Sequence, residues 1–289
     1  MKILRIPFNT LLAILLLAPL LLISSARASV IVGCSTLLNQ SYVDTLENWL
    51  GQGDFKLTNI YTKAPGDIGV DFHAAADGKG PTFAVMSAQA SDGSWKTVGG
   101  YNPISWDSSG QPHFTPDPAD WNAFIFNLSD SVLRRQSTVG QTTNRAFDGP
   151  FFGTIPLGPD LGVGADLSSA YSWGWSYGDA FNAATGTVGS DYQRSIIDGT
   201  INAGAFGVPL AMLEVFSVSQ IAAIPEPETV TLMLAGLGVL MLRARRSRSG
   251  GGNGSRDSDS NSNSNSNGSD SASGSGYCAG TSQPPASAL

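Results

Sequence analysis

The sequence feature that most constrains this chain is a short apolar run near its C-terminal end. Val230 to Leu242 gives thirteen consecutive residues without a strongly polar side chain, and Gly236 and Gly238 interrupt the run. As a helix that rises about 1.5 Å per residue it would span roughly 20 Å, whereas the hydrocarbon core of a bilayer is about 30 Å thick. The run is therefore either a marginal membrane span or a buried helix of a globular domain.

The flanking residues favour the membrane interpretation. Pro225, Glu226 and Pro227 precede the run, and a cluster of arginines between 243 and 248 follows it. Arginines after a span hold that end in the cytoplasm. The order of these three parts resembles the PEP-CTERM sorting signal of exported bacterial proteins. The resemblance implies that an exosortase, a membrane protease-transpeptidase, recognises the Pro-Glu-Pro motif of residues 223–248 and removes the span after transient membrane insertion.

The first 28 residues predict a secretory signal peptide. Lys2 and Arg5 make a basic start, residues 11–23 form an apolar core, and Ala26 and Ala28 give the small-x-small pattern of a signal peptidase site. A buried first helix is the alternative, but no polar residue marks an outward face. We therefore expect an exported protein that is transiently held at the inner membrane and ends in the cell envelope or outside the cell.

The two cysteines raise a second possibility for the N-terminal region. Residues 31–34 loosely match a lipoprotein box, which would place a lipid on Cys34. Arg27 separates the apolar core from this cysteine, which favours ordinary cleavage instead. Cys278 lies in the C-terminal tail, where the sorting topology would keep it cytoplasmic and reduced. We expect Cys34 to be the single thiol of the mature domain and to be buried as a small apolar residue.

Residues 29–222 are predicted to hold the only folded domain. From Ser29 to Ile224, eight lysines and arginines stand against eighteen aspartates and glutamates. An acidic domain does not suit nucleic acid or anionic lipid, which favour basic patches, so no nucleic-acid partner is expected. Residues 249–289, rich in serine, asparagine and glycine, lack the apolar content to form a core and are predicted to be a disordered tail.

Local patterns within the domain predict a mainly β (α+β) fold. Val43, Leu46, Trp49 and Leu50 share one helical face, with Ser41 and Asp44 as a capping box and Gly51 as the end of the helix. Alternating or continuous apolar runs predict strands at 55–62, on both sides of a turn at Asp92-Gly93 within 82–101, at 122–128 and at 212–218.

Five phrases of this region, in order, resemble TLDc domains. They are "DFHAAADGKGPTFAVM" (71–86), "VGGYNPISWDSSG" (98–110), "DWNAFIFNLSD" (120–130), "FDGPFFG" (147–153) and "MLEVFSV" (212–218), a closing strand that carries a glutamate. The similarity spans about residues 34–218 and is loosest between 160 and 200. It implies a central sandwich of two antiparallel sheets with short flanking helices, and it supplies no agreed catalytic residues.

Few residues suggest a catalytic centre. His73 and His113 are the only histidines, and His73 lies close to Asp77 in the sequence. The two could form an acid–base pair or bind a metal, but the interpretation that we favour has His73 bonded to a loop carbonyl. There is no Gly-x-Ser-x-Gly elbow, paired-histidine zinc motif, phosphate loop or dinucleotide fingerprint. We therefore expect no metal and no cofactor.

The most distinctive local pattern is an aromatic alternation. Tyr171, Trp173, Trp175 and Tyr177 alternate with small residues, so an extended strand would place all four rings on one face. An exposed face of this kind suits stacking against sugar rings. The alternative, which we favour, is that the face packs into the sandwich core; a further alternative is an aromatic loop without a fixed face.

These observations lead to one main hypothesis and two others. The main one is an exported, non-enzymatic binding or structural module of the cell surface or of an extracellular polysaccharide matrix. In the second, the domain is a secreted hydrolase of matrix glycans, with a pair of carboxylates or His73 at its centre. A third is oxidant scavenging through Cys34.

Overall fold

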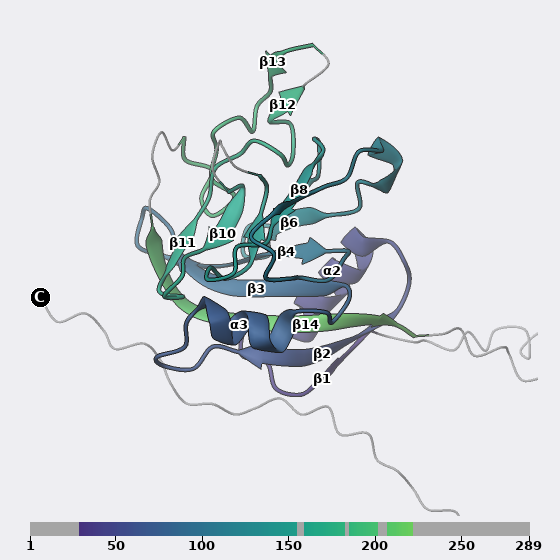
Figure 1. The fold of residues 1–289 in the computed structure, drawn as a ribbon, viewed down its shortest axis with the longest axis vertical. Helices are drawn as coiled ribbons and strands as arrows, with labels where there is room; N and C mark the ends of the chain where they lie inside the picture. The colour runs from purple at the N-terminus through teal and green to yellow at the C-terminus, as the bar shows by residue number, and fades with distance from the viewer. Residues whose placement is uncertain (1–28, 155–158, 183–184, 202–206, 222–289) are drawn as a thin grey trace, which may run out of the picture. The chain divides into compact units, whose positions relative to one another are not determined.

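The segments with apolar alternation form β-strands, and glycine-rich turns separate them (Figure 1). The computed structural model describes residues 29–154, 159–182, 185–201 and 207–221. This part of the chain is mainly β, with two antiparallel sheets and two short α-helices, which confirms the predicted fold class. The predicted signal peptide, sorting signal and tail lie outside the described residues.

One long strand, β14 (Val208–Gln220), links the two sheets. Its first residues pair with β11 (Ser169–Tyr171), and the rest of it lies between β3 (Thr82–Gln89) and β2 (Phe55–Thr62). Register irregularities interrupt its pairing with both neighbours, and β-bulges of this kind bend a strand. Figure 1 shows β14 beginning beside β11 and continuing along β3.

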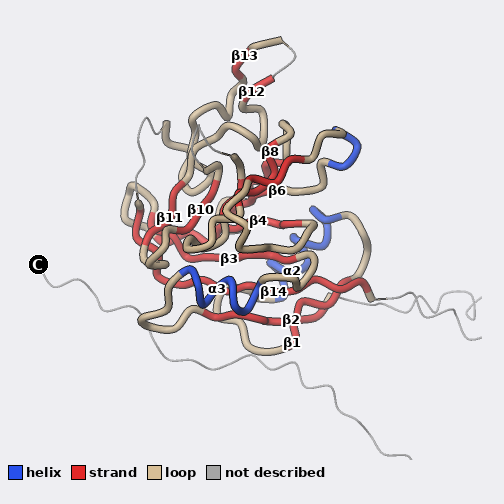
Figure 2. Tube along the Cα trace, viewed as in Figure 1, coloured by secondary structure: helices blue, strands red, loops and turns tan. Residues whose placement is uncertain are grey.

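The remaining strands complete the two sheets that share β14. Across the first sheet the order is β1 (Val30–Val32), β2, β14, β3, β4 (Trp95–Asn102), β6 (Phe124–Asn127) and β7 (Val132–Arg135), with β1 and β2 parallel. The second sheet runs from β14 through β11, β10 (Leu161–Val163), β9 (Phe151–Phe152) and β8 (Gly140–Thr143) to β5 (Pro112–Phe114). A small hairpin of β12 (Phe181–Asn182) and β13 (Thr187–Val188) projects from the sheets (Figure 2).

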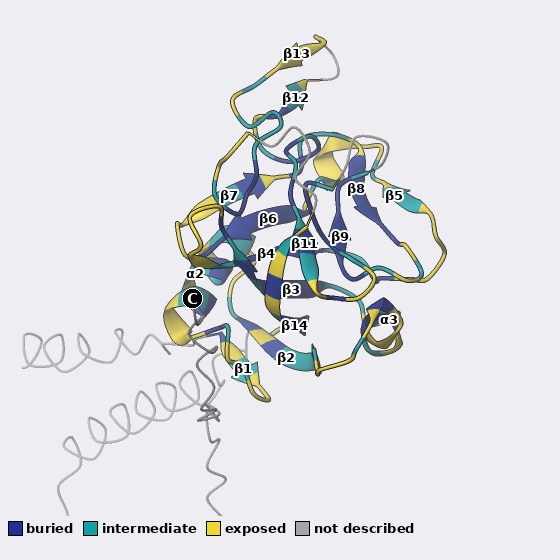
Figure 3. Cartoon of the chain, turned by 90° about the vertical axis from the view of Figure 1, so that its left-hand side faces the viewer, coloured by how far each residue is buried: buried dark blue, intermediate teal, exposed yellow. Residues whose placement is uncertain are grey.

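Two hydrophobic cores lie on the two faces of β3. Because successive side chains of a strand point to opposite faces, Phe83 and Val85 enter one core, while Ala84 and Met86 enter the other. The second of these cores also contains Phe152 from β9, which shows that the second sheet packs over the first. Buried residues run along the whole of β6 and β8 (Figure 3).

The helix α2 (Gln40–Leu50) closes the core on the outer face of the first sheet, and Val43 and Leu46 are buried there. Its N-cap differs from the prediction. Asn39 accepts a hydrogen bond from the backbone N–H of Tyr42 at 2.9 Å, so Ser41 already lies inside the helix. Asp44 instead accepts a bond from Gln40, one turn earlier, and therefore does not close a capping box. The end at Gly51, which has a φ of 67°, is as predicted.

A second helix, α3 (Gly69–Ala76), occupies a stretch for which no helix was expected. The Asp71 carboxylate accepts a hydrogen bond from the backbone N–H of Ile68 at 2.9 Å and so caps the first turn. Phe72 and Ala76 are buried against the core between the sheets. A Cβ on Gly69 would lie within 1.9 Å of the carbonyl oxygen of Phe147, so only glycine fits at this start of the helix.

The predicted strands agree closely with the observed ones. The strand at 55–62 is β2, the two strands around Asp92-Gly93 are β3 and β4, and the strand at 122–128 contains β6. The strand at 212–218 is the centre of the longer β14. Among the described residues, no helix is long and apolar enough to cross a membrane, and the predicted span at 230–242 lies outside them.

Glu214 fixes the N-terminal segment of the domain to β14. Its side chain is buried, with 1% of its surface exposed. One carboxylate oxygen accepts a hydrogen bond from Ser35 Oγ at 2.6 Å, and the other accepts bonds from the backbone N–H and the hydroxyl of Thr36, both at 2.8 Å. The glutamate of the closing strand is therefore a structural anchor.

The neighbouring Cys34 does not behave as expected. It is exposed rather than buried, because the turn after β1 carries it away from the core. It is also disulfide-bonded, so the prediction of a single free thiol is wrong, and with it the basis for oxidant scavenging by a Cys34 thiolate. Cys278, which was expected to be reduced, lies outside the described residues.

We expect Glu214→Gln to lower the free energy of unfolding by about 1 to 3 kcal/mol, because the amide nitrogen would face donors where a carboxylate oxygen now accepts. Urea denaturation followed by tryptophan fluorescence measures this. Glu47→Gln is the matched control: Glu47 is partly exposed and accepts one hydrogen bond, from Ser29 Oγ. Equal losses in the two variants would contradict the anchoring role of Glu214.

Candidate functional site

Both ring nitrogens of His73 lie within hydrogen-bonding distance of oxygen atoms inside the domain. Nδ1 lies 2.7 Å from Asp77 Oδ1, and Nε2 lies 2.7 Å from the carbonyl oxygen of Arg145, in a loop. On the other side of the aspartate, Ser108 Oγ donates to Asp77 Oδ2 at 2.7 Å. The aspartate thus lies between histidine and serine, whereas a hydrolytic triad needs the histidine between the other two.

This arrangement gives His73 and Asp77 a structural use. His73 is 4% exposed, and both of its ring nitrogens contact partners inside the domain. The bond to a loop carbonyl is the one that the favoured interpretation expects, and it ties α3 to the loop after β8. Within the described residues, no group of three histidine, cysteine, aspartate or glutamate side chains could hold a metal ion.

The four alternating rings do not form one exposed face. The strand β11 ends at Tyr171, and the chain beyond it is irregular. Tyr171, Trp173 and Trp175 are half-buried, whereas Tyr177 is fully buried and its hydroxyl donates to the carbonyl of Gln141. The extended strand with all four rings on one face is therefore not observed. The irregular backbone agrees with the aromatic-loop alternative, and the packing of Tyr177 agrees with the core alternative.

The carboxylate of Asp160 is the physical reason for the irregular backbone. Oδ1 accepts hydrogen bonds from the backbone N–H groups of Trp175, Ser176 and Tyr177 at 2.6, 2.8 and 3.1 Å, and Oδ2 accepts from Ser176 at 3.0 Å. Three successive N–H groups can converge on one carboxylate only if the chain turns, which a flat strand does not do.

Asp160 is fully buried, and this burial sets its electrostatics. Loss of solvation raises the pKa of the Asp160 carboxyl to about 7, although the three backbone N–H groups and the nearby Arg134 guanidinium act in the opposite direction. The guanidinium itself pairs with Asp191 at 3.0 Å and donates to the carbonyl of Arg194 at 2.7 Å. The turn is thus held by a compact polar network inside the domain.

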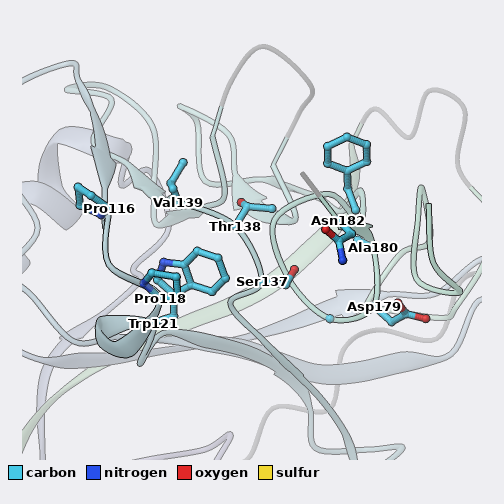
Figure 4. Close-up of a pocket in the computed structure, with 11 residues that line it drawn as sticks. Pro116, Pro118, Trp121, Ser137, Thr138, Val139, Asp179, Ala180 and Asn182 are labelled. Carbon is cyan, nitrogen blue, oxygen red and sulfur yellow. The ribbon is translucent and has the colours of Figure 1, made fainter. Parts of the chain in front are cut away.

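Next to this network lies a surface groove of about 510 Å³ (Figure 4). Three segments form it: the loop that contains the 3₁₀ turn Pro118–Asp120, the connection between β7 and β8, and the chain leading into β12. Its lining is mostly apolar, and it contains one carboxylate and no lysine, arginine or histidine. The lining residues are Pro116, Pro118, Trp121, Ser137, Thr138, Val139, Gly178, Asp179, Ala180, Phe181 and Asn182.

The polar network behind the groove connects two of these segments. Ser137 N–H donates to the carbonyl of Ser176 at 2.8 Å, and Gly178 N–H donates to that of Arg135 at 2.7 Å. The Asp191 carboxylate, paired with Arg134, also accepts the backbone N–H of Asp179 at 2.8 Å. The turn that Asp160 organises is therefore continuous with one wall of the groove.

Aromatic contacts support the two ends of the groove. Trp175 stacks on Phe181, with ring centres 4.6 Å apart and ring planes inclined by 14°, and Tyr192 packs on Trp175 from another side. Across the groove, the indole N–H of Trp121 donates to the carbonyl of Thr115 at 2.8 Å, which fixes the orientation of the ring. Two large rings are thus held in place on a partly exposed surface.

No local sequence pattern marks the groove. Trp121 follows "TPDPAD", whose prolines and aspartates indicate only a loop, and Ser137 and Phe181 belong to no periodic pattern. The aromatic alternation pointed to the right neighbourhood, because Trp175 supports Phe181 and Gly178 directly follows Tyr177. Of the predicted ligand contacts, Trp175 is next to the groove, while His73 and Asp77 belong to the separate cluster at α3.

We expect the free energy of unfolding to fall with rising pH between about 4 and 7 because of Asp160. A folded-state pKa of about 7, above the usual value of 3.8, means that the folded state keeps a proton that the unfolded state loses. The stabilising effect is complete below about pH 4 and is lost as the pH rises to about 7, which amounts to a change in the free energy of unfolding on the order of 4 kcal/mol. Urea unfolding of the wild type and of Asp160→Asn across this pH range measures the free energy of unfolding. The decrease of this free energy with rising pH should be absent in the variant.

The control for this prediction is Asp198→Asn. Hydrogen bonds from Thr200 and Ser91 outweigh burial and lower the pKa of Asp198 to about 2, so its contribution to stability is lost only as the pH falls below about 4. This variant should keep the wild-type slope between about pH 4 and 7. The same slope in the wild type and in Asp160→Asn would show that Asp160 is ionised throughout.

Comparison with known protein families matches residues 223–248 to the PEP-CTERM protein-sorting motif. The chain therefore carries a sorting motif of exported proteins, as the Pro-Glu-Pro pattern predicted, and an exosortase-type enzyme is its expected processing partner. The matched residues do not extend into the described domain, so the TLDc resemblance stays a prediction. A search among curated proteins finds no match to the chain.

Proposed function

We propose that the chain is exported, is sorted through residues 223–248, and serves as a non-catalytic binding or structural module of the cell surface or of an extracellular polysaccharide matrix. The sorting motif supports delivery through the membrane to the envelope. In this proposal signal peptidase cuts after Ala28 and an exosortase cuts at Pro225–Pro227, which leaves the TLDc-like domain of residues 29–222 as the mature part.

The single carboxylate of the groove is the observation that favours binding over hydrolysis. Asp179 is the one acidic residue in its lining. Glycosidases use two carboxyl groups, about 5 to 9.5 Å apart, on the two sides of the scissile bond. The other acidic groups nearby are engaged elsewhere, because Asp191 pairs with Arg134 and Asp160 holds three backbone N–H groups inside the domain.

Partly exposed aromatic rings support a binding role. Tyr171, Trp173 and Trp175 each remain half-buried, and Trp121 and Phe181 line the groove. Fixed rings of this kind supply apolar contact area at low cost in conformational entropy, which suits ligand binding. The hydrolase alternative would require a second carboxylate to reach the groove.

We expect Glu226→Ala to block processing at the sorting motif. In a host with an exosortase, the wild-type protein should lose its C-terminal segment and reach the envelope or the medium, whereas the variant should stay full-length in the membrane fraction. Mass spectrometry of both fractions gives the two ends of the mature chain and also tests cleavage after Ala28.

Glu228→Ala is the matched control, because it removes the next glutamate outside the Pro-Glu-Pro core. It should be processed as the wild type is. Cytosolic recovery of the intact wild-type chain, with its first 28 residues attached, would refute the proposed export.

A further inference from the structure

We propose that the groove lined by Trp121 and Phe181 binds a saccharide, whose sugar rings lie against these aromatic side chains. This inference deepens the proposed function and rests on it. It concerns residues that the aromatic alternation did not include.

The apolar part of the groove suits the C–H face of a sugar ring. The rings of Trp121 and Phe181 belong to segments that are about sixty residues apart in the chain, and the fold brings both to one groove. Both rings are held in position, because the indole N–H of Trp121 is hydrogen-bonded to the carbonyl of Thr115 and the ring of Phe181 stacks on Trp175. A volume of about 510 Å³ lies within the range of small-molecule sites.

The polar part of the groove suits hydroxyl donors. Asp179 is exposed, and hydrogen bonds from the backbone N–H and hydroxyl of Ser190 lower the pKa of its carboxyl, which keeps it an acceptor at neutral pH. Thr138 and Asn182 add a hydroxyl and an amide to the lining. Sugar hydroxyls can donate to the carboxylate while the ring face covers the aromatic surface.

Two other occupants fit less well. An anionic ligand would find no lysine, arginine or histidine in the lining and would meet the carboxylate of Asp179. An extended peptide that adds as a strand needs backbone N–H and C=O partners, and Pro116 and Pro118 on the rim have no N–H to donate. A neutral, hydroxyl-rich ligand agrees with both the charge and the rings.

The test measures saccharide binding by the secreted protein. Isothermal titration with cellohexaose, mannohexaose and chitohexaose, and affinity electrophoresis in gels that contain xylan or mannan, should give binding to at least one of these probes. Trp121→Ala and Phe181→Ala should each weaken that binding about tenfold or more, and Asp179→Asn about tenfold. Phe181→Ala alters a small projecting hairpin, so it tests the site even if Trp121→Ala fails to fold.

The chain offers matched controls for both rings. Trp95→Ala removes an exposed tryptophan at the start of β4, and Phe147→Ala removes a phenylalanine that is 70% exposed; neither residue lines the groove. Both variants should bind as the wild type does. Circular dichroism of each variant confirms that the fold is retained.

The outcomes separate the two proposals. Wild-type binding that survives in the folded Trp121→Ala or Phe181→Ala variant would overturn the groove as the site while leaving an exported binding module intact. Binding to none of the saccharides, or binding of a proline-rich peptide instead, would overturn the ligand class. Release of new reducing ends from a bound saccharide would overturn the non-catalytic function itself.

Discussion

The pairing of β14 with three other strands is the constraint on which the rest of the domain depends. At one end it forms hydrogen bonds with β11, and further along it lies between β3 and β2. A single strand therefore fixes how the second sheet is placed over the first. Glu214 on the same strand also holds Ser35 and Thr36, so the N-terminal segment depends on it as well.

Asp160, directly before β10 in the second sheet, has a comparable organising effect. Its carboxylate accepts hydrogen bonds from three backbone N–H groups, so the aromatic segment cannot continue as a strand and Tyr177 packs into the core. The same turn positions Trp175 behind Phe181 and brings Gly178 to the groove. The buried carboxylate does not line the groove. It influences the shape of the groove through the backbone segment to which it is hydrogen-bonded.

The sequence predicted the fold well where the signal is local. Alternation within 55–62 and 82–101 depends on neighbouring residues only, and these strands were found. The helix α3 was missed because its glycine and short alanine run give little amphipathic signal, and its stability comes from Phe72 and Ala76 in the core. Of the alternatives left open for the aromatic alternation, the single face is not formed, because Asp160, fifteen residues before Trp175, overrides the local preference for a strand. The groove joins three distant loops, which no pattern in one sequence can show.

Because β14 is the last strand in the chain order, both sheets are completed late in folding. The strand that completes both sheets is the last one of the domain to be synthesised, and its partners precede it by up to about 160 residues. Contacts of such long sequence separation form slowly, and the nascent chain cannot make them before Gln220 has emerged. The polypeptide accordingly cannot complete either sheet until its final strand has been made, and every shorter nascent chain leaves β2, β3 and β11 each without one of their partners.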